Sequence, residues 1–396
     1  MRAAIRAEIA AELDRLEQAG HRRRRPAIDS GNDRTIVLAQ PGPRRRLINW
    51  ASNDYLGYAQ HRKLRNAAAR ALRSYGAGAG SARLLSGGLR CHRRLEQRLA
   101  NWLGSEDVLI TTSGFQGNLA TIASLAGSRH DAIVLDRLCH ASLYDGARLS
   151  GARLLRFAHN DPADCARKLA RVADARRVVV AVESVYSMDG DEAPLPAIDR
   201  VCREHGALLV VDEAHALGVL GPGGRGGCAE AGIRPDVITA TCSKALGSQG
   251  GIVAADQDLI DYCVNRGRSF IFSTAAAPAT VGAAVAGLDL LRDDPEQGRR
   301  LIAEATAMRA AIAAQGWEVV PGRTPIIPVV VGAESAACRL AAALRERGHF
   351  APAIRPPTVP PNTCRLRLTL TLAHTRSDRR RLLADLATCR ALQPSG

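Results

Sequence analysis

Two polar side chains follow one buried, strand-like run, and a rare lysine follows the next. The apolar run at residues 207–211 leads into Asp212 and His215, and the run at residues 237–241 leads into Lys244. Only three of the chain's 54 lysine and arginine residues are lysines. Arginine supplies a fixed positive charge, but lysine can also lose its proton and act as an amine nucleophile. An acid, an imidazole and an amine are therefore predicted to meet in one crevice, where open α/β sheets bind ligands.

These groups suit chemistry on an aldehyde cofactor. The amine of Lys244 can form a Schiff base with an aldehyde, and a buried acid such as Asp212 can keep a ring nitrogen protonated, which makes the ring an electron sink. His140 follows a further strand-like run and is placed to stack on a planar ring. Residues 112–115 lead from a strand directly into a helix, whose free N–H groups would cradle a phosphate.

Residues 212–215 also spell the four-residue signature of an RNA-helicase family, in which the acids hold Mg²⁺. That mechanism requires a Walker A loop, in which a glycine directly precedes the lysine. No glycine precedes Lys63, Lys168 or Lys244. We therefore reject the helicase interpretation.

Composition indicates a globular protein with a large core. The 396 residues are 46% hydrophobic and 23% charged, which predicts a folded chain of about two domains. No window approaches 18 uninterrupted apolar residues, and acidic side chains occur throughout the first twenty residues, so we expect no membrane span and a cytoplasmic location. The ten cysteines are dispersed without metal-ligand spacing, so we expect no metal site.

The formal net charge of +15 raises the possibility of nucleic-acid binding. Arginine runs at residues 22–25, 44–46 and 379–381 would be its carriers. Aromatic residues make up only 4% of the chain and do not interleave with these runs, so no stacking platform is visible. We expect no nucleic acid, and a basic surface that suits an acidic or phosphorylated partner.

Strand and helix patterns alternate through the middle of the chain. This alternation predicts an α/β fold with a mostly parallel central sheet covered by helices on both faces. A long helical segment is expected from residue 278 to about 315. After it, strands at 326–331 and 365–371 alternate with helices at 335–347 and 376–392, which predicts a smaller α+β C-terminal domain. We expect a helical arm and hairpin over residues 1–52, a large domain over 53–285 and a small domain over 286–396.

The chain resembles the α-oxoamine synthases, pyridoxal-phosphate enzymes of the fold-type I aminotransferase class. Within that family it is most similar to the branch that makes 8-amino-7-oxononanoate in biotin synthesis, through residues 157–161, 354–360 and 365–369. The stretches that carry the family resemblance are residues 52–57, 112–115, 140–142, 183–191, 212–215 with 224–226, and Lys244.

The resemblance implies a role for each matching residue. Lys244 would bind pyridoxal 5'-phosphate as a Schiff base, Asp212 would pair with the ring nitrogen and His140 would stack on the ring. The resemblance further assigns Ser187 and His215 to the ring hydroxyl, Gly114, Phe115 and Thr241 to the phosphate, Ser273 and Thr274 to the phosphate of a neighbouring subunit, Asn53 and Arg367 to the amino-acid carboxylate, and Arg22 and Thr358 to the acyl substrate.

The implied reaction condenses L-alanine with a pimeloyl thioester, carried by acyl carrier protein or coenzyme A, with loss of CO₂. The implied assembly is a homodimer. Sister enzymes of the family share much of the sequence around Lys244 and His215, so the substrate remains open. The alternatives are a 2-amino-3-ketobutyrate ligase, a 5-aminolevulinate synthase or a sphingoid-base synthase; a basic RNA-binding protein on this fold is a remote one.

Overall fold

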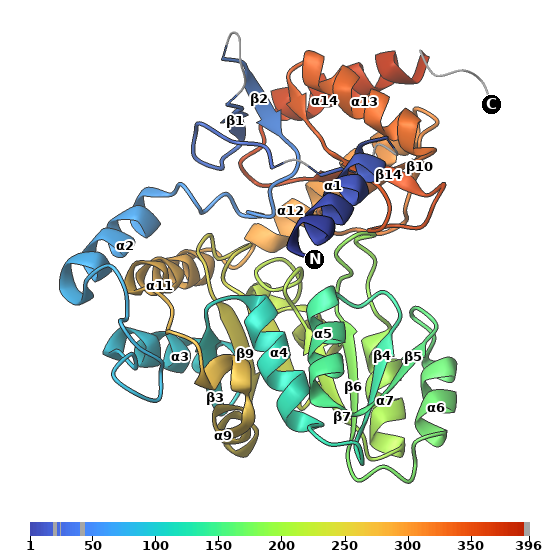
Figure 1. Cartoon of the computed structure of the whole chain (residues 1–396). Helices are drawn as coiled ribbons and strands as arrows, with labels where there is room; N and C mark the ends of the chain where they lie inside the picture. Colours follow the sequence, from blue (N-terminus) through green and yellow to red (C-terminus); the bar gives the residue numbers. More distant parts are fainter. Residues whose placement is uncertain (19–21, 24, 40–43, 392–396) are drawn as a thin grey trace.

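The computed structural model describes residues 1–18, 22–23, 25–39 and 44–391. Arg24, in the first of the three arginine runs, therefore lies outside the described residues. Figure 1 shows a large sheet with its covering helices below, and two smaller sheets with their helices above.

Seven strands form the large sheet, in the order β3-β9-β8-β7-β6-β4-β5. The pairs β5–β4, β4–β6, β6–β7 and β7–β8 are parallel, whereas β9 runs antiparallel to both β8 and β3. The predicted mostly parallel sheet is confirmed, although the reversal at β9 was not predicted. The strands are β3 (Asp107–Thr111), β4 (Ala132–Asp136), β5 (Arg153–Phe157), β6 (Val178–Glu183), β7 (Leu208–Asp212), β8 (Val237–Thr241) and β9 (Gly251–Ala255).

Both faces of this sheet are buried beneath helices. Successive side chains of a strand point to opposite faces and therefore pack against different helices. Ile133 and Leu135 of β4 pack with α4, α5 and α9, whereas Ala132 and Val134 pack with α6 and α7 on the other face. These helices are α4 (Gly114–Leu125), α5 (Ala141–Ser150), α6 (Pro162–Ala170), α7 (Leu195–Glu204) and α9 (Gln257–Arg266), with short segments η1 (Pro222–Gly224), α8 (Gly227–Ala231) and α10 (Arg268–Ile271) between them.

Three helices pack beside the large sheet. α11 (Pro278–Asp293) lies against α2 (Arg62–Tyr75) and α3 (Arg90–Leu103). The sequence predicted one helical segment from residue 278 to about 315, but it is two helices, because Pro295 follows the end of α11 and α12 (Gln297–Ala313) starts anew. α11 spans residues 285 and 286, where the small domain was expected to begin; the division into domains stays a prediction.

The smaller sheets complete the upper part of Figure 1. An antiparallel sheet in the order β10-β11-β14-β13 lies with α12, α13 (Glu334–Glu346) and α14 (Arg376–Ala391), and the third sheet has the order β1-β2-β12. The strands are β1 (Thr35–Val37), β2 (Arg46–Asn49), β10 (Glu318–Val319), β11 (Ile326–Gly332), β12 (His349–Phe350), β13 (Ala353–Ile354) and β14 (Cys364–Thr369).

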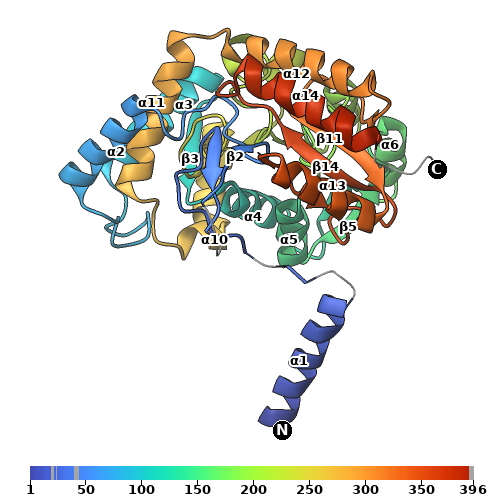
Figure 2. The same cartoon turned by 90° about the horizontal axis from the view of Figure 1, so that it is seen from above.

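The N-terminal helix α1 (Arg2–Gln18) buries no residue of its own. Figure 2 shows it projecting away from the rest of the chain. Its apolar side chains Ile5 and Ile9 are more than half exposed. The predicted helical arm is therefore present, and its apolar face has no partner within the described residues.

Candidate active site

The carboxyl ends of four neighbouring parallel strands bring the predicted site residues together. Glu183 ends β6, Asp212 ends β7, Thr241 ends β8 and His140 follows β4. They surround a cavity of about 180 Å³. Its lining is Ser113, Gly114, Phe115, Asn118, His140, Ser142, Glu183, Asp212, Ala214, His215, Thr241, Ser243 and Lys244. The predicted crevice at this edge of the sheet is thus a real cavity that contains Lys244.

Lys244 stands in a tight turn after β8. Gly247 closes this turn with φ +63°, and a Cβ there would lie 2.5 Å from the Cβ of Tyr58, so only glycine fits. Burial lowers the pKa of the Lys244 amine to about 8, although the charges of Asp212 and Glu183 act in the opposite direction. A lysine with such a pKa supplies a neutral amine close to neutral pH, as a nucleophile or base requires.

Asp212 is held rigidly beneath the cavity with only 6% of its surface exposed. One carboxylate oxygen accepts a hydrogen bond from the backbone N–H of Ala214 at 2.9 Å. The other accepts from the side-chain amide of Asn118 at 2.7 Å. Both bonds fix the orientation of the carboxyl group, which suits it to pair with a protonated ring nitrogen.

Asn118 also connects Asp212 to His140. Its amide donates to the hydroxyl of Ser142 at 2.8 Å, and that hydroxyl lies 2.8 Å from Nδ1 of His140. Nδ1 further accepts from the backbone N–H of Ser142 at the start of α5. Burial lowers the pKa of His140, so the imidazole is neutral and its orientation is set by this chain of hydrogen bonds.

His215 contacts a residue that lies far from it in the sequence. The hydroxyl of Tyr55 is 2.6 Å from Nδ1 of His215, and both side chains are buried. Burial lowers the pKa of His215 well below its usual value and raises the pKa of Tyr55 to about 12. Tyr55 therefore keeps its proton and donates to Nδ1, which leaves the single imidazole proton on Nε2 as a donor.

Glu183 is an acid that the sequence did not single out for chemistry. It pairs in register with Asp212 on the neighbouring strand and is 2% exposed. Burial, and after it the charge of Asp212, raise its pKa well above the usual range, which favours its neutral form. Its Oε1 is buried without a hydrogen-bond partner among the described residues.

A buried arginine of the four-stranded sheet β10-β11-β14-β13 lies beside the site. Arg367 of β14 donates to the carbonyl of Ser187 at 2.6 Å, to Oδ1 of Asn53 at 3.2 Å and to the hydroxyl of Thr369 at 2.9 Å. These partners are uncharged, so the guanidinium is oriented without being neutralised. Such a group suits a bidentate contact with a carboxylate.

The N-terminus of α4 fits an anion. Ser113 caps the helix by accepting from the N–H of Gln116, and the hydroxyls of Thr241 and Ser243 lie 2.7 Å apart beside it. At Gly114 an added Cβ would lie 3.3 Å from the Cβ of Thr241, so a larger residue would crowd this corner. The site therefore offers an amine, a carboxylate, two imidazoles and a phosphate-sized cradle, a donor set that fits pyridoxal phosphate.

The remaining predicted residues lie outside this cavity. The backbone of Ser187 contacts Arg367, but its side chain does not line the cavity. Ser273 and Thr274 lie beyond α10, and Thr274 forms a bridge with Ala82. Arg22 forms an ion pair with Glu17 instead of approaching Thr358.

Thr358 is contacted by the residue that follows Arg22. Arg23 donates to its hydroxyl at 3.0 Å. The assignment of Arg22 and Thr358 to the acyl substrate stays a prediction.

Among the described residues no helix combines the length and apolarity that a membrane crossing needs, and no cluster of His, Cys, Asp or Glu is arranged for a metal ion.

Sequence reasoning missed Tyr55, Asn118 and Ser142 as parts of the site. Asn118 lies one helical turn after Gly114, and this spacing alone could have indicated that both face the same cavity.

Comparisons with known proteins identify the family of this chain. Residues 45–386 match the family of class I and II aminotransferases. The chain is 45% identical over 381 residues to an 8-amino-7-oxononanoate synthase of Anaeromyxobacter dehalogenans, which covers 96% of this chain and 94% of that protein. The curated relative and the family match therefore both span nearly the whole chain.

Two solved structures are similar in three dimensions. Serine palmitoyltransferase with a pyridoxal-phosphate internal aldimine superposes with a TM-score of 0.91 at 28% identity, over 97% of each chain. An 8-amino-7-oxononanoate synthase from Francisella tularensis superposes with a TM-score of 0.73 at 26% identity, over 87% of this chain and 98% of that one. These neighbours confirm the predicted fold-type I architecture. The chain belongs to the class I and II aminotransferases and, among them, to the 8-amino-7-oxononanoate synthase family.

Proposed function

We propose that this chain condenses L-alanine with a pimeloyl thioester to give 8-amino-7-oxononanoate, CO₂ and the free thiol carrier, with pyridoxal phosphate as cofactor. The observation that carries the proposal is the buried amine of Lys244, with a pKa of about 8, in the same cavity as the fixed carboxylate of Asp212. Names of curated relatives at 45% identity support the same reaction.

The cofactor would be held by side chains that line this cavity and by Ser187, which lies outside it beside Arg367. Asp212 would pair with the ring nitrogen, His140 would cover the ring, and Nε2–H of His215 and the hydroxyl of Ser187 would bind the ring hydroxyl. Lys244 would hold the cofactor through its aldehyde group, and Gly114, Phe115 and Thr241 would bind the phosphate. When bound, pyridoxal phosphate supplies the electron sink that stabilises negative charge at the α-carbon of the amino acid.

Arg367 and Asn53 bind the carboxylate of alanine. The hydrogen bonds of Arg367 to Ser187 and Thr369 fix the plane of its guanidinium before the substrate arrives. Pre-orientation of this kind places the α-carbon relative to the amine of Lys244 at little entropic cost. The same contact must release the carboxylate when CO₂ leaves.

Lys244 is the proton carrier of the reaction. Once the amino group of alanine has displaced it from the cofactor, the free amine of Lys244 would take the α-proton of alanine, hold it as an ammonium, and later return a proton to the product carbon. A pKa close to the working pH suits both directions of transfer. Burial lowers the pKa of His215 well below its usual value, so this imidazole does not compete for the proton.

Arg22 and Thr358 contact the acyl substrate in this proposal. The hydrogen bond from Arg23 to Thr358 supports it by joining the arginine run of the N-terminal arm to the proline-rich segment that contains Thr358.

The active unit is a homodimer in which Ser273 and Thr274 reach the phosphate of the cofactor bound by the partner subunit. Large apolar side chains beside these residues support this, since Phe272 is 71% exposed and Leu85 is 78% exposed. The backbone bond from Ala275 to Ser81 ties the two loops into one surface. Exposed apolar patches of this kind mark protein–protein contacts.

Alanine is favoured over serine and glycine by the comparisons. The serine palmitoyltransferase shares 28% of its residues with this chain, whereas the 8-amino-7-oxononanoate synthase shares 45%. The backbone similarity to the serine palmitoyltransferase reflects the common fold, and fold does not specify the substrate.

The test uses the purified protein loaded with pyridoxal phosphate. L-Alanine, glycine and L-serine are added separately while the visible spectrum is recorded, and pimeloyl-CoA follows with product analysis by mass spectrometry. We expect a spectral change with alanine and formation of 8-amino-7-oxononanoate. Product from glycine alone would favour a ligase or aminolevulinate synthase, and a visible cofactor band that is unchanged in Lys244→Ala would refute the assignment of the lysine.

A further inference from the structure

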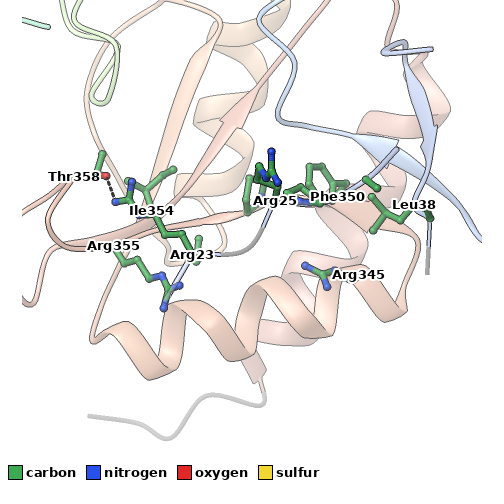
Figure 3. A pocket seen from close by; sticks show the side chains of 13 residues that line it. Arg23, Arg25, Leu38, Arg345, Phe350, Ile354, Arg355 and Thr358 are labelled. Carbon is green, nitrogen blue, oxygen red and sulfur yellow. Dashed lines mark hydrogen bonds between the residues drawn. The ribbon is translucent and has the colours of Figure 1, made fainter. Parts of the chain in front are cut away.

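A second cavity lies between the N-terminal arm, α13 and the edge strand β13. It measures about 740 Å³, which is within the size range of small-molecule sites. Figure 3 shows arginine side chains lining it from three segments: Arg23 and Arg25 come from the arm, Arg345 from α13, and Arg355 follows β13. Four guanidinium groups from separate parts of the chain thus gather around one hollow.

Most of this positive charge is not neutralised by the protein. Arg355 donates to Glu334 at 2.9 Å, but Arg23 donates to the uncharged hydroxyl of Thr358. Within the described part of the chain, no carboxylate forms an ion pair with Arg23, Arg25 or Arg345. Like charges gathered in a concave surface raise the local potential and attract an anion.

The rest of the lining is apolar. Leu38, Phe350 and Ile354 contribute side chains to the same cavity. A bare inorganic anion would leave this surface uncovered. The combination of guanidinium groups and apolar side chains fits a ligand that joins a phosphate to a longer, partly apolar chain.

The cavity is also close to the proposed alanine site. Its strand β13 pairs with β14, and Ala353 stands opposite Leu366, the residue before Arg367. Adjacent strands lie about 5 Å apart, so one strand spacing separates this lining from the strand that binds the substrate carboxylate. The cavity is therefore next to the strand that carries Arg367.

We propose that this cavity binds the phosphate of the phosphopantetheine arm that carries the pimeloyl group. Arg25 and Arg345 contact the phosphate, and the apolar lining contacts the pantetheine chain. The proposal rests on the proposed function, which requires a pimeloyl thioester. Because coenzyme A and acyl carrier protein present the same arm, the shared chemistry is the phosphate and the experiment separates the two carriers.

The test compares three pimeloyl thioesters, those of coenzyme A, acyl carrier protein and N-acetylcysteamine, the last of which has no phosphate. The variants are Arg345→Gln and Arg25→Gln, with Arg339→Gln as the matched control, because Arg339 is exposed on the same helix and does not line the cavity. The measured quantity is the ratio of kcat/KM with a phosphorylated carrier to kcat/KM with N-acetylcysteamine. A general loss of folded protein or of bound cofactor lowers both kcat/KM values by the same factor and therefore cancels in this ratio.

We expect the ratio to fall about tenfold in Arg345→Gln and in Arg25→Gln, as for the loss of one charge-assisted contact, and to stay at the wild-type value in Arg339→Gln. A fall with only one carrier supports the site and identifies that carrier as the one whose phosphate the cavity binds. An unchanged ratio in both cavity variants, or an equal fall in the control, overturns the assignment. If the wild type makes no product from any of the three thioesters, the proposed function fails instead.

Discussion

Lys244→Met should stabilise the protein near neutral pH even though it abolishes catalysis. Burial lowers the pKa of Lys244 from 10.5 to about 8, which means that the folded state disfavours the ammonium. The difference between these two values corresponds to about 3 kcal/mol of folding free energy. This figure already includes the opposing influence of the nearby carboxyl groups, which raises the pKa of Lys244.

The dependence on pH distinguishes this effect from ordinary repacking. Below about pH 8 the lysine is charged in the folded and unfolded states, and the wild type bears the full cost of the buried charge. Between about pH 8 and pH 10.5 the folded state has lost the proton while the unfolded state still binds it, so the stability of the wild type rises with pH. Above that window the advantage of the variant should disappear.

The assay is guanidinium unfolding of the cofactor-free protein at about pH 7 and about pH 10, for wild type and variant together. Lys63→Met is the matched control, since Lys63 is 61% exposed in a surface ion pair, and it should change stability by less than about 0.5 kcal/mol. A variant that is less stable than wild type at neutral pH, or a difference that is the same at both pH values, would refute the reasoning.

Three further changes test other parts of the site. Arg367→Gln should raise the KM for L-alanine about 30-fold, since a buried charge-assisted contact is lost; initial rates at varied alanine check this, and a changed KM for the thioester alone would contradict it. Tyr55→Phe should weaken cofactor binding about tenfold by releasing Nδ1 of His215, as measured by equilibrium dialysis; unchanged affinity would contradict it. Burial opposes protonation of His159, but its two carboxylate partners outweigh this and raise its pKa to about 9. His159→Asn should therefore lose stability that the wild type has in full below pH 6.5 and loses as pH rises toward 9, which pH-dependent unfolding measures; a pH-independent difference would argue against it.

Much of the fold follows from local patterns that the sequence displays directly. Each predicted strand of the large sheet was found, because a buried parallel strand needs a continuous apolar run. The antiparallel direction of β9 was not predicted, since its apolar run has the same appearance in either direction. The sequence predicted one helix where the structure has α11 and α12. The break at residues 294–296 is short, and the segments on both sides of it have helical patterns.

Local sequence patterns are enough to predict which groups meet, because Lys244, Asp212 and His215 follow buried strands and the carboxyl ends of parallel strands share one edge. The charge and orientation of those groups depend instead on tertiary packing. Tyr55 reaches His215 across 160 residues of sequence, and the alignment of β6 with β7 places Glu183 beside Asp212. Such contacts depend on how distant segments pack, and burial, which shifts each pKa, exists only once they have packed.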